Sequence, residues 1–222
     1  MTPLSPIEIY ARLHEAQGPL GWWPAESAVE MAIGAVLTQN TAWVNVERAL
    51  ANLRDAGLLD AAALVAQPDE TLAANLRPSG YFNIKTRRVK ALAGFLVDRV
   101  GGDPALLAGW PPAEARAALL AVPGVGRETA DSILLYAAGH PIFVIDAYTR
   151  RLAGRLGFAD PTLDYDALRR RFEDALPRDT ALFNDFHAQI VVHGKDRCRP
   201  RPRCDGCPLA DRCPAATHGG PR

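Results

Sequence analysis

All four cysteines of the chain lie within sixteen residues, as Cys198, Cys204, Cys207 and Cys213, spaced C-x5-C-x2-C-x5-C. In a reducing compartment, four close thiolates suit a metal centre better than disulfides. Zinc usually takes two CxxC pairs separated by a longer loop, whereas one CxxC with two equal arms is closer to a compact iron–sulfur ligand set. We therefore expect a structural iron–sulfur centre, with zinc as the alternative.

A proline–glycine turn, Pro123-Gly124-Val125-Gly126, separates two apolar helical patterns. Glycine permits unusual backbone angles, and its missing side chain lets another molecule approach the main chain. The turn amides lie at the positive end of a helix expected to begin near Arg127, where a phosphate is attracted. The sequence predicts a helix–hairpin–helix unit that binds an anion, and an ordinary helix–helix connection is the alternative.

Basic residues are concentrated in two places, although the formal net charge is zero. Residues 77–90 hold five basic residues and no acid, and residues 195–203 hold five against Asp196 alone. Two basic patches on a neutral chain favour a nucleic-acid partner. A solvated face is the alternative for either patch alone.

The elements that must position these residues are helices. Apolar residues recur at three- and four-residue spacing in segments 6–16, 26–38, 43–56, 60–66, 69–76, 85–100, 113–120, 127–138, 147–157, 164–175 and 180–193. The run PIFVI at 141–145 is too short to found a sheet and predicts a buried connector. The predicted class is all-α, and the final THGGPR is expected to be disordered.

Composition and the first residues bear on location. No apolar run approaches 18 residues, so no membrane span is expected. The start MTPLSPIEIY has no basic-then-apolar signal pattern. We expect a cytoplasmic protein, associated with a bacterial nucleoid.

Several motifs together resemble a known family. VPGVG before a helix, Asp146 at the end of an apolar run and the four-cysteine tail resemble the endonuclease III branch of the helix–hairpin–helix DNA glycosylases. The resemblance implies two helical domains with DNA bound between them, one at residues 26–141 and the other at 1–25 plus 142–222. It also implies a 4Fe–4S cluster on the four cysteines, although the first cysteine arm is one residue shorter than the usual pattern.

The resemblance also assigns roles to individual residues. Gln39 lies where relatives place a side chain that enters the duplex, and Asp146 where they place the catalytic carboxylate. Extruding a nucleotide brings its sugar beside such a carboxylate, which stabilises an oxocarbenium-like transition state and orients water. Helix capping is the other role open to Asp146. The expected DNA-binding residues are Gln39, Gly124, Val125, Gly126, Arg127, Thr129, Lys85 and Arg199.

One departure from the family pattern decides the expected mechanism. Bifunctional relatives carry a Schiff-base lysine where this chain has Glu128. A carboxylate cannot form an imine, so strand cleavage by that route is excluded at this position. Together with Asp131, Glu128 complements the positive end of its helix, and it is also a candidate for lining the base pocket.

Aromatic residues suggest the substrate. GWWPAES, LTQNTAW, RPSGYFN and IDAY resemble the monofunctional 3-methyladenine DNA glycosylases of the same superfamily. In that group aromatic side chains sandwich the extruded purine, which makes Trp22, Trp23 and Trp43 candidates for stacking. Alkylated purines are cationic, and aromatic faces attract cations.

The predicted function is therefore a monofunctional DNA N-glycosylase for alkylated purines, acting as a monomer on double-stranded DNA with damaged bases and without a membrane. Two alternatives remain open. One is an endonuclease III-like glycosylase for oxidised pyrimidines with weak or absent lyase activity, and the other is a non-catalytic protein that binds damaged DNA.

Overall fold

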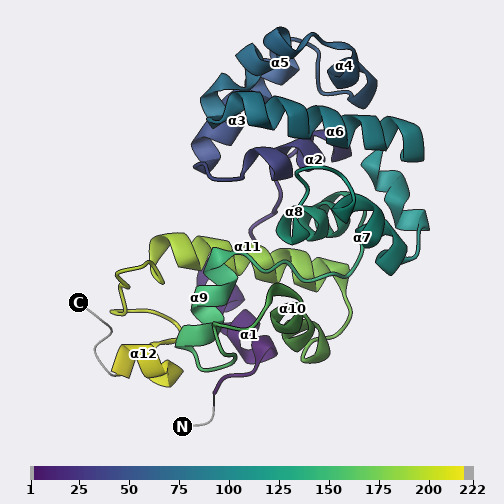
Figure 1. The fold of residues 1–222 in the computed structure, drawn as a ribbon. Helices are drawn as coiled ribbons and strands as arrows, with labels where there is room; N and C mark the ends of the chain where they lie inside the picture. The colour runs from purple at the N-terminus through teal and green to yellow at the C-terminus, as the bar shows by residue number, and fades with distance from the viewer. Residues whose placement is uncertain (1–2, 218–222) are drawn as a thin grey trace. The chain divides into compact units, whose positions relative to one another are not determined.

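The computed structural model describes residues 3–217. These residues form helices joined by turns and contain no β-strand, which confirms the predicted all-α class. By their internal contacts they divide into two compact units (Figure 1). The continuous unit is Pro24–His140, and the discontinuous unit combines Met1–Trp23 with Pro141–Arg222. The tail predicted to be disordered, 217–222, lies almost wholly outside the described residues.

The continuous unit is built from α-helices and short helical turns. Its α-helices are α2 (Ala28–Leu37), α3 (Trp43–Asp55), α4 (Ala61–Ala66), α5 (Asp69–Leu76), α6 (Phe82–Val100), α7 (Pro112–Leu120) and α8 (Arg127–Ser132). The short helical turn η1 (Arg77–Ser79) joins α5 to α6, and η2 (Pro104–Gly109) lies between α6 and α7. A third turn, η3 (Ile133–Ala137), continues α8. Both α4 and α5 pack on α6 (Figure 1), and α2 packs on η3. Every residue of α2 from Glu30 to Leu37 is buried, so α2 is the central helix of this unit.

The discontinuous unit combines α1 (Pro6–Gln17) with α9 (Ala147–Arg155), α10 (Tyr165–Asp174), α11 (Thr180–Asp196), η4 (Ala210–Arg212) and α12 (Pro214–Thr217). Both α1 and α9 pack on α11. Its core is aromatic: the ring of Phe143 stacks on Phe172 at 4.5 Å and meets Phe183 and Phe186 edge-on. Such rings bury large apolar areas in favourable offset and edge geometries.

The segment 141–145 is the buried connector that the sequence predicts. Ile142 to Ile145 are nearly inaccessible and have no regular secondary structure. Side chains satisfy its backbone instead, because the amide of Phe143 donates to Glu173 Oε1 at 3.0 Å and that of Ile145 to the Tyr165 hydroxyl at 3.3 Å. A buried amide without such an acceptor would cost about 1–3 kcal/mol, so these two contacts stabilise a connector without a sheet.

Each predicted helical segment coincides with an observed helix, with three differences of detail. Helix α6 begins at Phe82, three residues earlier than expected, directly after Tyr81 in the left-handed region (φ 45°). Helix α11 continues to Asp196. The expected helix 127–138 is α-helical only to Ser132 and continues as the π-helical turn η3. None of the described helices is long and apolar enough to cross a bilayer.

Candidate functional site

The predicted hairpin is present, as α7, a tight turn and α8. Gly124 has φ +89°, a conformation that residues with a side chain rarely adopt. Val122 and Val125 are buried beneath the turn, and the amide of Val125 donates to the carbonyl of Val122 at 3.0 Å. Gly124 and Gly126 are exposed. The turn therefore offers backbone rather than side chains to a partner, and its predicted role in DNA binding stays a prediction.

A bidentate ion pair holds the two hairpin helices together. Arg116 on α7 donates to both carboxylate oxygens of Asp131 on α8, at 2.6 and 3.1 Å. Asp131 is fully buried and accepts two charge-assisted hydrogen bonds from this guanidinium. Its predicted effect on the positive end of the helix stays a prediction. Glu128 is exposed one turn earlier, in the first turn of α8.

The side chain of Gln39 is bound to the hairpin. Its Nε2 donates to the carbonyl of Gly124 at 3.1 Å and to Oγ1 of Thr129 at 3.0 Å, while its Oε1 accepts from Arg88 Nη1. Both amide hydrogens are thereby used inside the protein. The predicted entry of Gln39 into a duplex stays a prediction, and it requires these contacts to break.

Lys85 is not part of an exposed basic patch, so its predicted contact with DNA is wrong. Its side chain is 1% exposed, and its Nζ donates to the carbonyls of Leu37 at 2.8 Å and Ser79 at 2.7 Å. Burial, and secondly the nearby charge of Arg88, lower the pKa of Lys85 to about 8. The lysine joins the end of α2 to the turn before α6. The sequence did not reveal this because both carbonyls lie on other segments.

Asp146 stands at the first turn of α9, where it caps the helix as the sequence suggests. Its Oδ1 accepts from the amide of Thr149 at 2.7 Å, and its Oδ2 lies 3.6 Å from Nε2 of His187 on α11. The carboxylate is 12% exposed. Burial raises the pKa of Asp146, but His187 and the Thr149 amide outweigh burial and hold that pKa below its ordinary value. The structure thus provides an ionised carboxylate in a largely dry environment.

His187 is a residue that sequence reasoning missed. It is 7% exposed and faces Asp146 from α11, 41 positions later in the chain. A single histidine within an apolar helical pattern carries no local signal of such a partner. Only the packing of α9 on α11 reveals the pair.

The candidate stacking residues fall in both units. Trp22 and Trp23 are half-buried in the discontinuous unit, with ring centroids 6.0 Å apart in an edge-to-face arrangement. The Lys195 ammonium lies 5.6 Å from the centroid of the Trp22 ring, within cation–π range. Trp43 begins α3 in the continuous unit. A common pocket of the three tryptophans stays a prediction.

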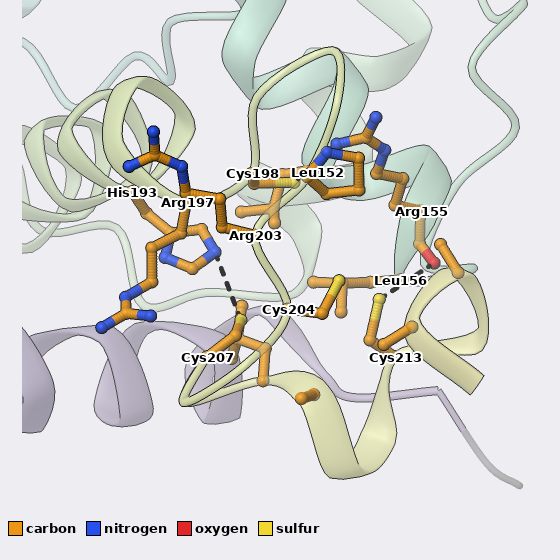
Figure 2. A pocket seen from close by; sticks show the side chains of 15 residues that line it. Leu152, Arg155, Leu156, His193, Arg197, Cys198, Arg203, Cys204, Cys207 and Cys213 are labelled. Carbon is orange, nitrogen blue, oxygen red and sulfur yellow. Dashed lines mark hydrogen bonds between the residues drawn. The ribbon is translucent and has the colours of Figure 1, made fainter. Parts of the chain in front are cut away.

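The four cysteines surround one small cavity in the discontinuous unit. All four line a space of about 30 Å³, together with Arg155, Arg197, Arg203 and His193 (Figure 2). Arg155 Nη1 donates to Cys198 Sγ at 3.2 Å, and Cys207 Sγ lies 3.7 Å from His193 Nε2. Burial raises the pKa of the Cys207 thiol. The guanidinium of Arg155 beside Cys198 suits the negative charge of a thiolate-bound centre.

The same geometry bears on a single metal ion. Within residues 3–217, no group of three or more His, Cys, Asp or Glu side chains is close enough to hold one. A zinc ion requires its sulfur ligands at about 2.3 Å from one point. The expected iron–sulfur centre on the four cysteines therefore stays a prediction, with zinc as the alternative.

Other basic candidates lie at the surface. Arg127 is exposed at the start of α8, and Arg199 is exposed in the cysteine loop. The backbone carbonyl of Arg199 accepts from Arg155 Nη1 at 2.6 Å, which fixes the loop while leaving the Arg199 side chain at the surface. Contact of either side chain with phosphate stays a prediction.

An all-helical chain with a glycine hairpin, a capping aspartate after a buried connector and a four-cysteine loop defines a class of DNA repair proteins. The HhH-GPD superfamily base excision DNA repair model matches residues 33–178. The chain therefore belongs to the HhH-GPD superfamily of base excision DNA repair proteins, and it is a DNA glycosylase by class.

Individual relatives agree with this family. A Methanocaldococcus jannaschii protein, whose name describes a candidate DNA repair glycosylase, is 41% identical over 87% of this chain and 89% of its own length. Endonuclease III of Escherichia coli is 28% identical over 88% of this chain and 87% of its own.

Solved structures show the same fold. The 3-methyladenine DNA glycosylase of Helicobacter pylori, bound to 1,N6-ethenoadenine, has a TM-score of 0.77 and 28% identity, covering 86% of this chain and 98% of that chain. An endonuclease III in a non-covalent DNA complex has a TM-score of 0.82 over 97% of this chain and 98% of its own, at 22% identity.

Proposed function

We propose that this glycosylase is monofunctional, acting as a monomer on double-stranded DNA to release alkylated purines of the 3-methyladenine type. The observation that carries the proposal is that the chain has a buried, ionised Asp146 but a glutamate, Glu128, in place of a lysine on the hairpin helix. The first residue can support hydrolysis of an N-glycosidic bond. The second cannot attack the sugar to form an imine.

Asp146 acts on the extruded nucleotide. As the bond between C1′ and the base nitrogen breaks, the departing base takes the electron pair and the sugar gains positive charge. The carboxylate stabilises that charge and orients a water, which adds to C1′ and gives up a proton. Because N3- and N7-alkylated purines already carry positive charge, they leave as neutral bases, and one carboxylate is sufficient assistance.

The positions of the lysines support hydrolysis without strand cleavage. The sequence contains only Lys85, Lys90 and Lys195, and none lies on α8. The amine of Lys85 is buried against two carbonyls, and that of Lys90 contacts Asp69 Oδ1 at 2.5 Å. Lys195 lies over the Trp22 ring. No lysine of this chain therefore takes the place of the missing amine at position 128.

The substrate class rests on the aromatic residues and on one relative. Trp22 and Trp23 offer aromatic faces, which attract cationic purines. The structure of the Helicobacter pylori 3-methyladenine DNA glycosylase, which is 28% identical to this chain, contains 1,N6-ethenoadenine. Trp43 and Glu128 are further candidates for the pocket.

We propose that the hairpin and the basic loops bind the phosphate backbone. Gly124 and Gly126 present backbone amides, Thr129 supports the turn through Gln39, and Arg127 and Arg199 add charge. Phosphate contacts position a duplex without reading its sequence.

We propose that Cys198, Cys204, Cys207 and Cys213 hold a 4Fe–4S cluster. Endonuclease III relatives and the cysteine-lined cavity support this assignment. The cluster would cross-link the loop that carries Arg199, and it takes part in no step of base release.

The deciding experiment compares products before and after alkali. The pure protein is incubated with duplexes carrying 3-methyladenine, 1,N6-ethenoadenine, thymine glycol or an abasic site. We expect free alkylated base and an intact abasic strand that breaks only after alkali, with no complex trapped by borohydride. Strand cleavage and trapping by the wild type would overturn the monofunctional assignment, and release of thymine glycol alone would favour the oxidised-pyrimidine alternative. A damage-binding protein would release no base from any duplex.

A further inference from the structure

We propose that His187 is a positioning residue for Asp146: from the facing helix it fixes the orientation of the buried carboxylate for base release. The inference rests on the proposed function, in which Asp146 is the catalytic carboxylate. His187 itself need not touch the DNA.

The two carboxylate oxygens of Asp146 have different partners. Oδ1 accepts from the amide of Thr149 at 2.7 Å, a contact that the helix geometry imposes. Oδ2 lies 3.6 Å from His187 Nε2. The cap contact through Oδ1 restrains rotation of the carboxylate about its bond to Cβ only in part. A second partner on another helix restricts that rotation further.

Burial makes the second partner consequential. Asp146 is 12% and His187 7% exposed, so water screens their interaction little. Desolvation by itself favours the protonated acid, which could not stabilise a positive sugar. His187 first, and then the amide and side chain of Thr149, oppose this effect of desolvation on the Asp146 pKa. Of the two, only His187 can carry a charge.

The packing of the helices fixes the position of His187. Gly194, two turns further along α11, has no room for a side chain, because a Cβ there would lie 2.5 Å from Cδ1 of Tyr148 on α9. Arg151 on α9 also donates to the carbonyls of Cys198 at 2.7 Å and Gly194 at 3.1 Å. These contacts hold α11 against the helix that Asp146 caps. His187 is therefore held on a rigid element opposite the carboxylate.

The test compares His187→Leu, His187→Gln and a matched control. Leucine removes both the polar contact and the possible charge, while glutamine keeps a neutral N–H donor. His14→Gln is the control, because His14 forms another His–Asp pair in the same unit, with Asp185 at 2.9 Å and far from Asp146 in sequence. Single-turnover base release is measured against pH on a 3-methyladenine duplex, and the Asp146 carboxyl pKa is measured by carbon-13 NMR without DNA.

We expect His187→Leu to lower the rate of base release at least about tenfold while changing duplex affinity less than about threefold. The acid limb of its pH profile and the Asp146 pKa should both rise, because a group that lowers this pKa has been removed, and His187→Gln should recover part of the rate. His14→Gln should match the wild type. A purely structural histidine would lower stability without moving the pH profile or the pKa.

The outcomes separate this inference from the proposed function. In one outcome, the wild type releases base, and both His187→Gln and His187→Leu keep the wild-type rate and the wild-type Asp146 pKa. That outcome would overturn the role of His187 alone. No base release by the wild type, with a raised Asp146 pKa in the His187 variants, would overturn the function and keep the pair. If His187→Leu does not fold, the NMR pKa and pH profile of His187→Gln decide, and wild-type values for both overturn the inference.

Discussion

The side chain of Arg88 lies across the backbone of Gly124. A Cβ atom at Gly124 would stand 2.7 Å from Arg88 Cδ, closer than real side-chain contacts come, and the guanidinium beyond it donates to Gln39. The glycine is therefore required by its neighbour as well as by its φ of +89°.

Gly124→Ala should lower the free energy of unfolding by about 1–3 kcal/mol, because the new methyl group displaces Arg88 and strains the turn. The displaced arginine should also weaken binding to damaged and undamaged duplexes alike. Urea denaturation and fluorescence anisotropy measure the two effects. Gly126→Ala is the matched control, since nothing lies within 4 Å of a Cβ there and its φ is −91°. Equal stability losses in the two variants would contradict the role of Arg88.

Gln39→Ala should destabilise the protein even without DNA, by about 1–2 kcal/mol, because its amide contacts Arg88, Gly124 and Thr129. Thermal unfolding of the free protein measures this. Asn83→Ala, at an exposed position of α6, serves as the control. If Gln39 served the duplex alone, its removal would leave the free protein's stability unchanged and affect only lesions that are stably paired.

Lys85→Met should cost about 2–4 kcal/mol, because two buried carbonyls lose their donor. The cost should depend on pH. The pKa of Lys85 is lowered from 10.5 to about 8 by folding, so between these values the unfolded state holds more protons. The contribution of Lys85 to stability should therefore rise with pH across this window. Urea unfolding of both proteins from pH 7 to 10 measures the difference. Lys90→Met on the same helix is the control and should cost at most about 1 kcal/mol.

Asp146→Asn should abolish base release while keeping the fold, since asparagine caps a helix as well as aspartate does. Asp146→Ala should lose the rate and also about 0.5–2 kcal/mol of stability. Because the pKa of Asp146 is lowered in the folded protein, the stability advantage of the wild type over the asparagine variant is present above about pH 4. It should be lost as the pH falls through the lower folded value. Denaturation from pH 6 to pH 3 checks this sign, and an advantage that grows on acidification would refute it.

Cys204→Ser should reduce the iron content and the folding yield, because the serine hydroxyl is a poor ligand for an iron–sulfur centre. The wild type, prepared anaerobically, should be brown and hold about four irons per chain. Metal analysis and visible absorption measure both. Arg203→Ala, beside the ligand and also lining the cavity, should keep its iron. Stoichiometric zinc without iron in the wild type would reject the cluster.

The fold was largely predictable from the sequence because each helix carries its own apolar spacing. The π-helical turn at Ile133–Ala137 was not, since its residues follow the same apolar pattern as an α-helix. The buried connector at 141–145 was predictable from its apolar run. Its acceptors, Glu173 and Tyr165, were not, because they come from α10.

The candidate site was predictable where a motif is local, as at the hairpin, the cysteines and the cap residue Asp146. The contacts of residues whose partners lie far away in the sequence were not predicted. The sequence around Lys85 predicts a surface cation. In the fold, its amine instead donates to the carbonyl of Leu37, 48 positions earlier. Gln39 likewise meets Gly124 across 85 positions. Such contacts depend on tertiary packing, which periodicity and composition do not encode.

The division of one compact unit between two stretches of chain sets an order of events on the ribosome. Helix α1 leaves the ribosome before the other described helices, but α11, on which it packs, begins only at Thr180. At about 5–20 residues per second, the roughly 160 intervening residues take about 8–30 s to synthesise. The continuous unit, Pro24–His140, is complete before then and can fold during that interval. Throughout that interval the apolar side chains of α1, Ile9 and Leu13 among them, lack the helix on which they pack, so the first of the described helices to be made is among the last to be buried.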